Sequence, residues 1–436
     1  MNNEDLKTED LKYIWHPCTQ MKDHEKIPLI PIKKGEGIYL EDFDGNRYID
    51  AISSWWVNIL GHNNKYINDY IKSQIDTLEH VLLAGFTHEP AIKLAKKLVE
   101  ITPKGLNKVF YADNGSSGIE VALKMSFQYY KNRGKTKPYF LSLENSYHGE
   151  TIGALSISDL GLYKDVYEDI LIRSIKTPTP KNQTKEESKK ALVKLEKVLI
   201  KRSNEICAFI IEPLVQCAGL MNMYNHIFLK EARELCKKYD VLFIADEIAV
   251  GFGRTGKLFA CEHADISPDI MLLSKGLTGG YLPLCSVMIS DFIYNEFYND
   301  YKYYEKAFLH SHSYTGNPIC CSAALASIDY LEKYDIINKN QEKILYINKK
   351  LQKFKNLKNV KVVRQTGMIA AIELQGYTSE QRIGLKVYEY ALKKGVLLRP
   401  LSNVIYFMPP YIITKNEIDK IVSIAYEAIE ILLITN

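Results

Sequence analysis

Several polar residues stand where short apolar runs end and where predicted β-strands would stop. Lys275 follows the run DIMLL, Asp246 closes VLFIA, and Tyr147 and His148 follow YFLSLENS. Burial lowers the pKa of a lysine and makes it a nucleophilic amine. A carboxylate at the end of a buried strand needs a cation or an N–H partner, and an aromatic pair can stack on a planar ring. Each residue taken alone also has an ordinary explanation, as a lysine that reaches solvent, a turn cap or half-buried packing.

The segment DNGSSG at 113–118 adds a candidate phosphate site. Gly115 and Ser116 lie between the predicted strand KVFYAD and a helix, so their N–H groups face outward at a helix N-terminus. The same residue types also form ordinary turns and N-caps. Together, the four signals supply a phosphate cradle, a ring-stacking pair, a carboxylate for a ring nitrogen and an amine for an aldehyde. Their conjunction predicts pyridoxal 5'-phosphate as the cofactor.

Alternating helices and apolar runs must position these residues. We predict strands at 108–113, 139–144, 207–213, 241–247 and 269–275, separated by helices that include 118–132, 186–202 and 226–238. Continuous apolar runs between helices indicate an α/β fold with a mainly parallel sheet covered on both faces. Because the carboxyl ends of parallel strands share one edge of the sheet, we expect the candidate residues to gather there.

The remaining sequence predicts a second, smaller α/β domain. Residues 1–62 are expected to form an N-terminal arm and part of the small domain. The first 35 residues would be irregular with short strands, and a hairpin is expected at 37–50 around Asp44-Gly45. Residues 63–328 would form the large cofactor domain. A long helix near 317–353 would lead into a C-terminal small domain at 329–436, with strands VKVVRQ and MIAAIEL and a helix at 380–394.

Composition excludes several classes of protein. The 436 residues are 46% hydrophobic and carry 56 Lys+Arg against 52 Asp+Glu, and a net charge of +4 predicts neither a nucleic-acid nor a membrane partner. Apolar runs are far shorter than the roughly 20 residues of a membrane span, and the start of the chain lacks a secretory signal. The eight cysteines contain no C-x-x-C pair, so we predict no metal site and a cytoplasmic protein with free thiols.

Residues 244–280, IADEIAVGFGRTGKLFACEHADISPDIMLLSKGLTGG, resemble the central signature of the class III, fold-type I pyridoxal-phosphate-dependent aminotransferases. The resemblance extends over nearly the whole chain and implies a transaminase. More narrowly, the segments IWHPCTQM, SSWW, YHGETIGA, HSHSYTGNP and LLRPLSNVIYFMPPYII resemble one branch of that family. Its members transfer the amino group of S-adenosylmethionine to 8-amino-7-oxononanoate in biotin biosynthesis, giving 7,8-diaminononanoate.

The resemblance implies a role for each cofactor residue. Lys275 would bind the cofactor covalently and move a proton between the substrate Cα and the cofactor, and Asp246 would pair with the ring nitrogen. Gly115 and Ser116 would bind the phosphate. Tyr147 would stack near the cofactor and touch the substrate.

Further roles follow from the same resemblance. His312 and Ser313 would contact the phosphate of the neighbouring subunit, which implies a homodimer with a shared active site, and Ser311 would contact substrate near the interface. The expected substrate-binding residues also include Trp55, Trp56, Arg399 and Cys18. Trp55 would form an apolar wall beside Trp56, and Arg399 would hold the substrate carboxylate. The tryptophans could equally be core residues, and Arg399 could cap a strand.

Cys18 departs from the family pattern. The family usually has Tyr or Phe there, to stack on the adenine of the donor, and a thiol cannot stack. Lysine as the amino donor is therefore one alternative. Another ω-aminotransferase or a glutamate semialdehyde aminomutase on the same fold is a second alternative. A non-catalytic pyridoxal-phosphate-binding regulator is a third, which the presence of Lys275 in its motif disfavours.

Overall fold

The computed structural model describes residues 2–27 and 29–434. The chain forms two compact units. The larger comprises residues 66–341 and 365–368, and the smaller comprises residues 1–65, 342–364 and 369–436, so both chain ends contribute to the smaller unit. The main boundaries fall after residue 65 and after residue 341, where the sequence suggested 62 and 328.

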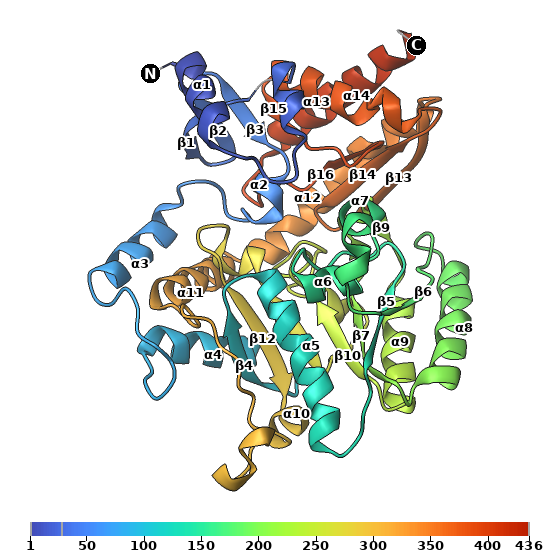
Figure 1. Ribbon diagram of the computed structural model, residues 1–436. Coiled ribbons are helices and arrows are strands. Elements are labelled where there is room, and N and C mark those ends of the chain that lie inside the picture. The colour runs from blue at the N-terminus through green and yellow to red at the C-terminus, as the bar shows by residue number, and fades with distance from the viewer. Residues whose placement is uncertain (1, 28, 435–436) are drawn as a thin grey trace. The chain divides into compact units, whose positions relative to one another are not determined.

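A seven-stranded sheet forms the centre of the larger unit (Figure 1). Its strand order is β4-β12-β11-β10-β7-β5-β6. The pairs β11–β10, β10–β7, β7–β5 and β5–β6 are parallel, and only β12 runs against its neighbours. The strands are β4 (Leu106–Ala112), β5 (Tyr139–Leu143), β6 (Ile175–Thr177), β7 (Ile206–Ile211), β10 (Leu242–Asp246), β11 (Ile270–Leu273) and β12 (Cys285–Ser290). The predicted α/β fold with a mainly parallel sheet is confirmed.

Helices cover the faces of this sheet because its strands are apolar on both sides. Helix α5 (Gly115–Asn132) packs on one face, where it shares a buried cluster with Leu242 and Ile244 of β10. Strand alternation turns Phe243 to the other face, where its ring lies 5.9 Å from that of Phe209. Helix α9 (His226–Lys238) also packs on β10, and α8 (Lys185–Arg202) packs on α9. Helices α4 (Glu89–Ile101) and α11 (Pro318–Lys333) pack on each other.

Two small sheets build the smaller unit. One has the order β1-β2-β3-β15, with β1 (Ile32–Glu36), β2 (Tyr39–Asp42), β3 (Arg47–Asp50) and β15 (Val396–Leu397). The predicted hairpin is confirmed as β2–β3, whereas β15 joins β3 in parallel from the other end of the chain. The second sheet comprises β13 (Val360–Thr366), β14 (Ile369–Leu374) and β16 (Val404–Phe407).

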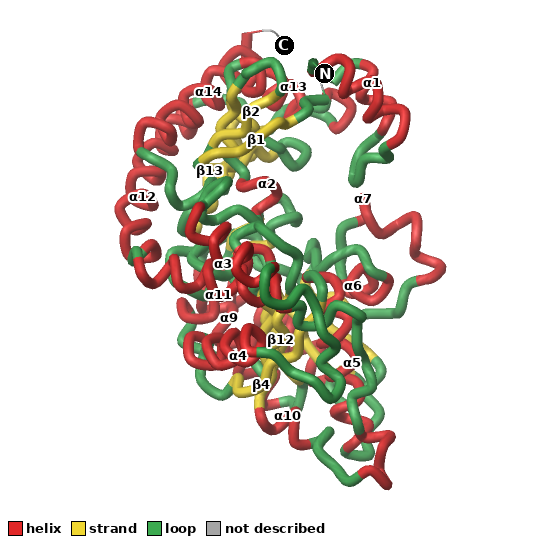
Figure 2. Tube along the Cα trace, turned by 90° about the vertical axis from the view of Figure 1, so that its left-hand side faces the viewer, coloured by secondary structure: helices red, strands yellow, loops and turns green. Residues whose placement is uncertain are grey.

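Helices support these small sheets. They are α12 (Ile336–Leu351), α13 (Ile383–Lys393) and α14 (Lys415–Ile434), drawn in red in Figure 2. Asp419 of α14 accepts a hydrogen bond from Tyr346 Oη at 2.8 Å and pairs with Lys350 Nζ at 2.7 Å, which joins α14 to α12. No helix in the described ranges combines the length and apolar character needed to cross a membrane.

Two predictions about helices were wrong. Residues 3–13 form helix α1 (Asn3–Tyr13) and not an irregular arm, because Asn2 and Asp5 form a capping box that starts the helix without an apolar stripe. The expected long helix near 317–353 is two helices, α11 and α12. They separate at Asp335, whose φ of 51° is left-handed and cannot continue a right-handed helix.

Candidate active site

The sheet brings the predicted residues of the larger unit to one edge. Asp246 is the last residue of β10 and pairs in register with Leu272 of β11, three residues before Lys275. On the other side of β10, Ala245 pairs with Ile211, the residue before Glu212. Parallel pairing therefore places an amine and two carboxylates at the ends of three adjacent strands.

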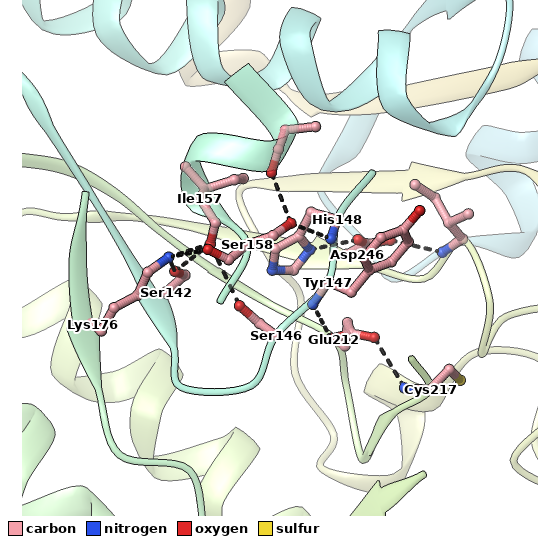
Figure 3. A network of polar contacts seen from close by, with 12 residues as sticks. Ser142, Ser146, Tyr147, His148, Ile157, Ser158, Lys176, Glu212, Cys217 and Asp246 are labelled. Atoms are coloured by element: carbon pink, nitrogen blue, oxygen red, sulfur yellow. Dashed lines mark hydrogen bonds and ion pairs between the residues drawn. The ribbon is translucent and has the colours of Figure 1, made fainter. Parts of the chain in front are cut away.

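Asp246 is held by a histidine from the loop after β5. Its Oδ2 atom lies 2.7 Å from Nδ1 of His148, and its Oδ1 atom accepts the Ile248 N–H at 3.1 Å (Figure 3). Both side chains are buried, at 3% exposure for His148 and 5% for Asp246. The sequence suggested His148 and Tyr147 as a ring-stacking pair, and in the structure the His148 ring contacts Asp246. The sequence signal that could have predicted this contact is the position of His148 in a loop after a strand, at the same sheet edge as Asp246.

A second polar layer fixes the backbone beside His148. Ser158 Oγ accepts the His148 N–H at 2.9 Å and donates to the Ala154 carbonyl at 2.8 Å. The Lys176 ammonium donates to the carbonyls of Ile157 and Ser158 at 2.6 and 2.9 Å, at the end of a short helix (Figure 3). Burial lowers the pKa of Lys176 to about 7. These bonds hold the loop that carries His148 against the sheet.

Glu212 is a buried acid beside Asp246 and His148. Its carboxylate accepts the N–H groups of Tyr147 at 3.0 Å and Cys217 at 3.1 Å. Burial, and then the charge of Asp246, raise the pKa of Glu212 to about 8. Glu212 therefore ties the Tyr147 loop to the segment that follows β7.

Lys275 leaves β11 in a left-handed conformation, with φ of 47°. Burial lowers the pKa of its amine, and the nearby charge of Asp246 opposes that shift. Non-glycine residues in this region cost roughly 1–3 kcal/mol and cluster at functional sites. The side chain thus combines an unusual backbone with a lowered pKa, as expected for a reactive amine.

The first turn of α5 offers open N–H donors. Asn114 caps the helix by accepting the Ser117 N–H at 3.0 Å, and Gly118 N–H donates to the Asn114 carbonyl at 2.9 Å. Within the described residues, the N–H groups of Gly115 and Ser116 have no protein acceptor. They lie at the positive end of an 18-residue helix, which favours an anion.

Tyr147 lies at the same edge, partly exposed. Its hydroxyl donates to Glu150 at 2.9 Å, and its ring lies 5.7 Å from that of Tyr163. Glu150, which the sequence did not single out, fixes the direction of the phenol ring.

The loop with Ser311, His312 and Ser313 makes its contacts with residues of the larger unit. His312 Nδ1 lies 3.6 Å from Oδ2 of Asp113, the residue that precedes the capping Asn114. The carbonyl of Ser313 accepts a hydrogen bond from His80 at 2.7 Å, and the side chains of Ser311 and Ser313 are exposed. The role of this loop toward a second subunit stays a prediction.

The smaller unit brings together two of its four predicted residues. The guanidinium of Arg399 lies 4.7 Å from the centre of the Trp55 ring, and Trp55 is 40% exposed. Trp56 is buried and donates from Nε1 to Tyr406 Oη at 3.1 Å, so its position is that of a core residue. Cys18 is exposed, with a left-handed φ of 49°.

The described residues contain no group of three or more His, Cys, Asp or Glu side chains that could hold a metal ion.

Known proteins resemble the chain over nearly its full length. A protein from Helicobacter pylori named adenosylmethionine-8-amino-7-oxononanoate aminotransferase is 52% identical over 426 residues, which cover 96% of each chain. A protein of that name from Geobacter sulfurreducens is 42% identical and covers 97% of this chain and 96% of its own.

Solved structures agree with these sequence matches. The aminotransferase of the same name from Methanocaldococcus jannaschii superposes with a TM-score of 0.95 at 40% identity, covering 98% of this chain and 99% of its own. An ω-transaminase from Pseudomonas jessenii in complex with PMP has a TM-score of 0.91 at 28% identity and covers 98% of this chain and 97% of its own. These neighbours share the fold-type I architecture of the chain. The profile of the family described as Aminotransferase class-III matches residues 19–429, and the chain therefore belongs to this family.

Proposed function

We propose that the protein transfers the amino group of S-adenosylmethionine to 8-amino-7-oxononanoate and so makes 7,8-diaminononanoate for biotin biosynthesis. The observation that carries the proposal is the sheet edge that holds Lys275 and Asp246, together with the open N–H groups of Gly115 and Ser116 at the start of the helix that follows β4. The substrate pair rests on relatives at 42–52% identity whose names state it, against 28% for the ω-transaminase.

Pyridoxal phosphate is the cofactor we propose. Enzymes of the class-III family depend on it in general. The residues fit the group: the first turn of α5 can take the phosphate, and Asp246 retains lone pairs for the ring nitrogen beyond its bonds to His148 and Ile248. Lys275 can hold the aldehyde carbon, and Tyr147 can lie against the ring.

The protein's own residues then control one proton. Bound pyridoxal phosphate supplies an electron sink for the carbanion that forms when the amine-bearing carbon loses its proton. Lys275 Nζ would take that proton and return it, a task favoured by its lowered pKa, because more of the amine is unprotonated near neutral pH. Asp246 would keep a positive charge on the ring nitrogen, and Tyr147 would stack near the ring and touch the substrate.

The substrate contacts come from further along the chain. Arg399 would bind the carboxylate of 8-amino-7-oxononanoate, and the exposed face of Trp55 would pack on its apolar chain. We propose a homodimer in which His312 and Ser313 contact the phosphate bound by a second copy and Ser311 lies near its substrate. Because Trp56 is buried, we propose that it supports Trp55 by packing in the core and does not touch the substrate itself.

Lysine as the amino donor is the second candidate. It is favoured by Cys18, because an exposed thiol cannot stack on adenine as an aromatic residue would. The acceptor and the chemistry would stay the same.

A half-reaction separates the two donors. The holoenzyme is mixed with S-adenosylmethionine or with lysine, without acceptor, and the cofactor absorbance is followed. We expect only S-adenosylmethionine to convert the aldehyde form of the cofactor to the amine form. If lysine converts the cofactor and S-adenosylmethionine does not, lysine is the donor. If 8-amino-7-oxononanoate is not aminated with either donor, the proposed acceptor is wrong.

A Lys275→Ala variant tests the chemistry itself. We expect no turnover and no absorption band from a covalently held cofactor. Retained turnover would contradict the assignment of Lys275.

A further inference from the structure

The four residues labelled α2 in Figure 1 form a left-handed turn. Ser53, Ser54, Trp55 and Trp56 have φ values of 53°, 46°, 70° and 74°, and none of them is glycine. The left-handed conformation costs about 1–2 kcal/mol for each such residue. Such strain persists only where the surrounding structure enforces it.

The carboxylate of Asp50 enforces this turn. Oδ1 accepts the N–H groups of Ser54 at 2.9 Å and Ile52 at 3.4 Å, and Oδ2 accepts the Ser54 hydroxyl at 2.7 Å. Asp50 is fully buried, so these bonds take the place of its hydration. If the turn relaxed, the carboxylate would lose most of its donors, and therefore the two features stabilise each other.

His62 holds Asp50 from the other side. Its Nε2 lies 3.0 Å from Oδ2 of Asp50, and its Nδ1 lies 2.9 Å from Nδ2 of Asn58. The His62 ring therefore bridges the Asp50 carboxylate and the Asn58 amide. The His62 backbone is bonded in both directions to Gly37, at 2.6 and 3.1 Å. Gly35 packs closely on His62, since a Cβ atom there would lie 2.8 Å from the His62 Cβ.

The turn separates two neighbouring tryptophans. Trp56 enters the core and bonds to Tyr406, whereas Trp55 is 40% exposed with its ring 4.7 Å from the Arg399 guanidinium. Ser53 Oγ anchors the start of the turn to the Met408 carbonyl at 2.7 Å. The turn thus determines which indole ring faces outward.

We propose that Asp50 and His62 are positioning residues for substrate recognition, which hold the left-handed turn that presents Trp55 beside Arg399. The proposal rests on the proposed function, in which Trp55 and Arg399 form the wall and the anchor of the substrate pocket. Neither residue touches the reacting atoms, and both act through Ser54 and Trp55.

Steady-state kinetics of the holoenzyme provide the first test. We expect Asp50→Asn to raise KM for 8-amino-7-oxononanoate about five- to tenfold and to change kcat less than about twofold, because a binding contact and not a chemical step is lost. The cofactor absorption should be unchanged. The matched control is Asp42→Asn, since Asp42 is also buried in this unit and accepts bonds from Asp44, Asn46 and Tyr48. An equal rise in KM for both variants would overturn the proposal.

Coupling provides the second test. If Asp50 acts through the indole, adding Asp50→Asn to Trp55→Ala should raise KM no further. A full additional rise would show that Asp50 acts by another route. Should Asp50→Asn fail to fold, Ser54→Ala removes only the hydroxyl bond and is expected to raise KM about two- to threefold.

Fluorescence separates positioning from function. The chain has three tryptophans, and in a Trp15→Phe background the signal comes from exposed Trp55 and buried Trp56. Acrylamide quenching should increase in Asp50→Asn and His62→Gln but not in Asp42→Asn. Unchanged quenching would overturn the positioning role. If quenching changes in the Asp50 and His62 variants but Trp55→Ala has a normal KM, the positioning role stands and the proposed substrate pocket is wrong.

Discussion

The ring of His148 is bonded through one of its nitrogens to the carboxylate of Asp246. Nδ1 lies 2.7 Å from Oδ2 of Asp246, and among the described residues no group bonds to Nε2. The Nδ1 contact and the Ile248 N–H, 3.1 Å from Oδ1, hold the Asp246 carboxylate in one orientation and leave it lone pairs for a cationic partner.

The first prediction concerns Asp246→Asn. The amide is similar in size, but it carries no charge and cannot keep a proton on a ring nitrogen. We expect kcat to fall about 100- to 1000-fold, in the range seen when one preorganised electrostatic contact is removed. Single-turnover absorbance measures this, with Asp265→Asn in an exposed turn as the control. A loss of less than tenfold would contradict the role of Asp246.

The pH dependence of stability tests Glu212. Its pKa of about 8 in the folded chain lies above the ordinary value of 4.5 because of burial and the charge of Asp246. The folded state therefore binds the proton more tightly than the unfolded state between about pH 4.5 and 8. Stability from this group is fully present below pH 4.5 and is lost as the pH rises through 8.

Urea unfolding at several pH values measures this effect. We expect Glu212→Gln to flatten the decline between pH 5 and 8. Glu247 provides a comparison, because burial raises its pKa only to about 7. Its contribution to the free energy of unfolding should therefore be lost at a lower pH than that of Glu212. If the free energy of unfolding of the wild type rose from pH 5 to 8, the predicted effect of Glu212 would be contradicted.

Gly149→Ala tests the close contact between the His148 loop and the phosphate cradle. A Cβ atom there would lie 2.1 Å from Ser116 Oγ, and the glycine has a φ of +125°. We expect a loss of about 2–4 kcal/mol in stability and weaker cofactor binding, because Ser116 must move. Gly134→Ala has the same kind of backbone strain, with φ of +73° but open space around it, so it should retain cofactor affinity. Thermal unfolding and cofactor titration decide the point.

Arg399→Leu tests the carboxylate anchor. We expect KM for 8-amino-7-oxononanoate to rise about 10- to 100-fold, since a charge-assisted pair with the substrate is lost. The donor half-reaction should change less. Arg47→Leu is the matched control, because Arg47 also lies over an aromatic ring in this unit, 4.3 Å from the centre of Tyr39. Equal effects of the two substitutions would point to general destabilisation.

Much of the larger unit could be predicted because its signals are local. Apolar runs of strand length between amphipathic helices predict the parallel sheet, and the chain order then places Asp246 and Lys275 at the ends of adjacent strands. The start of α1 was missed because its helix signal lies in a polar capping box and not in an apolar stripe. The break at Asp335 was missed because a left-handed residue has no clear pattern in the sequence.

The sequence by itself determined the family, the sheet and the residue types available for chemistry, since these depend on periodicity and on motifs contiguous in the chain. Only the tertiary structure decided which partners those residues have. His148 bonds to a carboxylate 98 positions away, Ser53 bonds to a carbonyl 355 positions away, and the Trp55 ring lies beside Arg399. Such contacts depend on how strands pair and turns close, and local sequence signals do not encode the distances between segments so far apart in the chain.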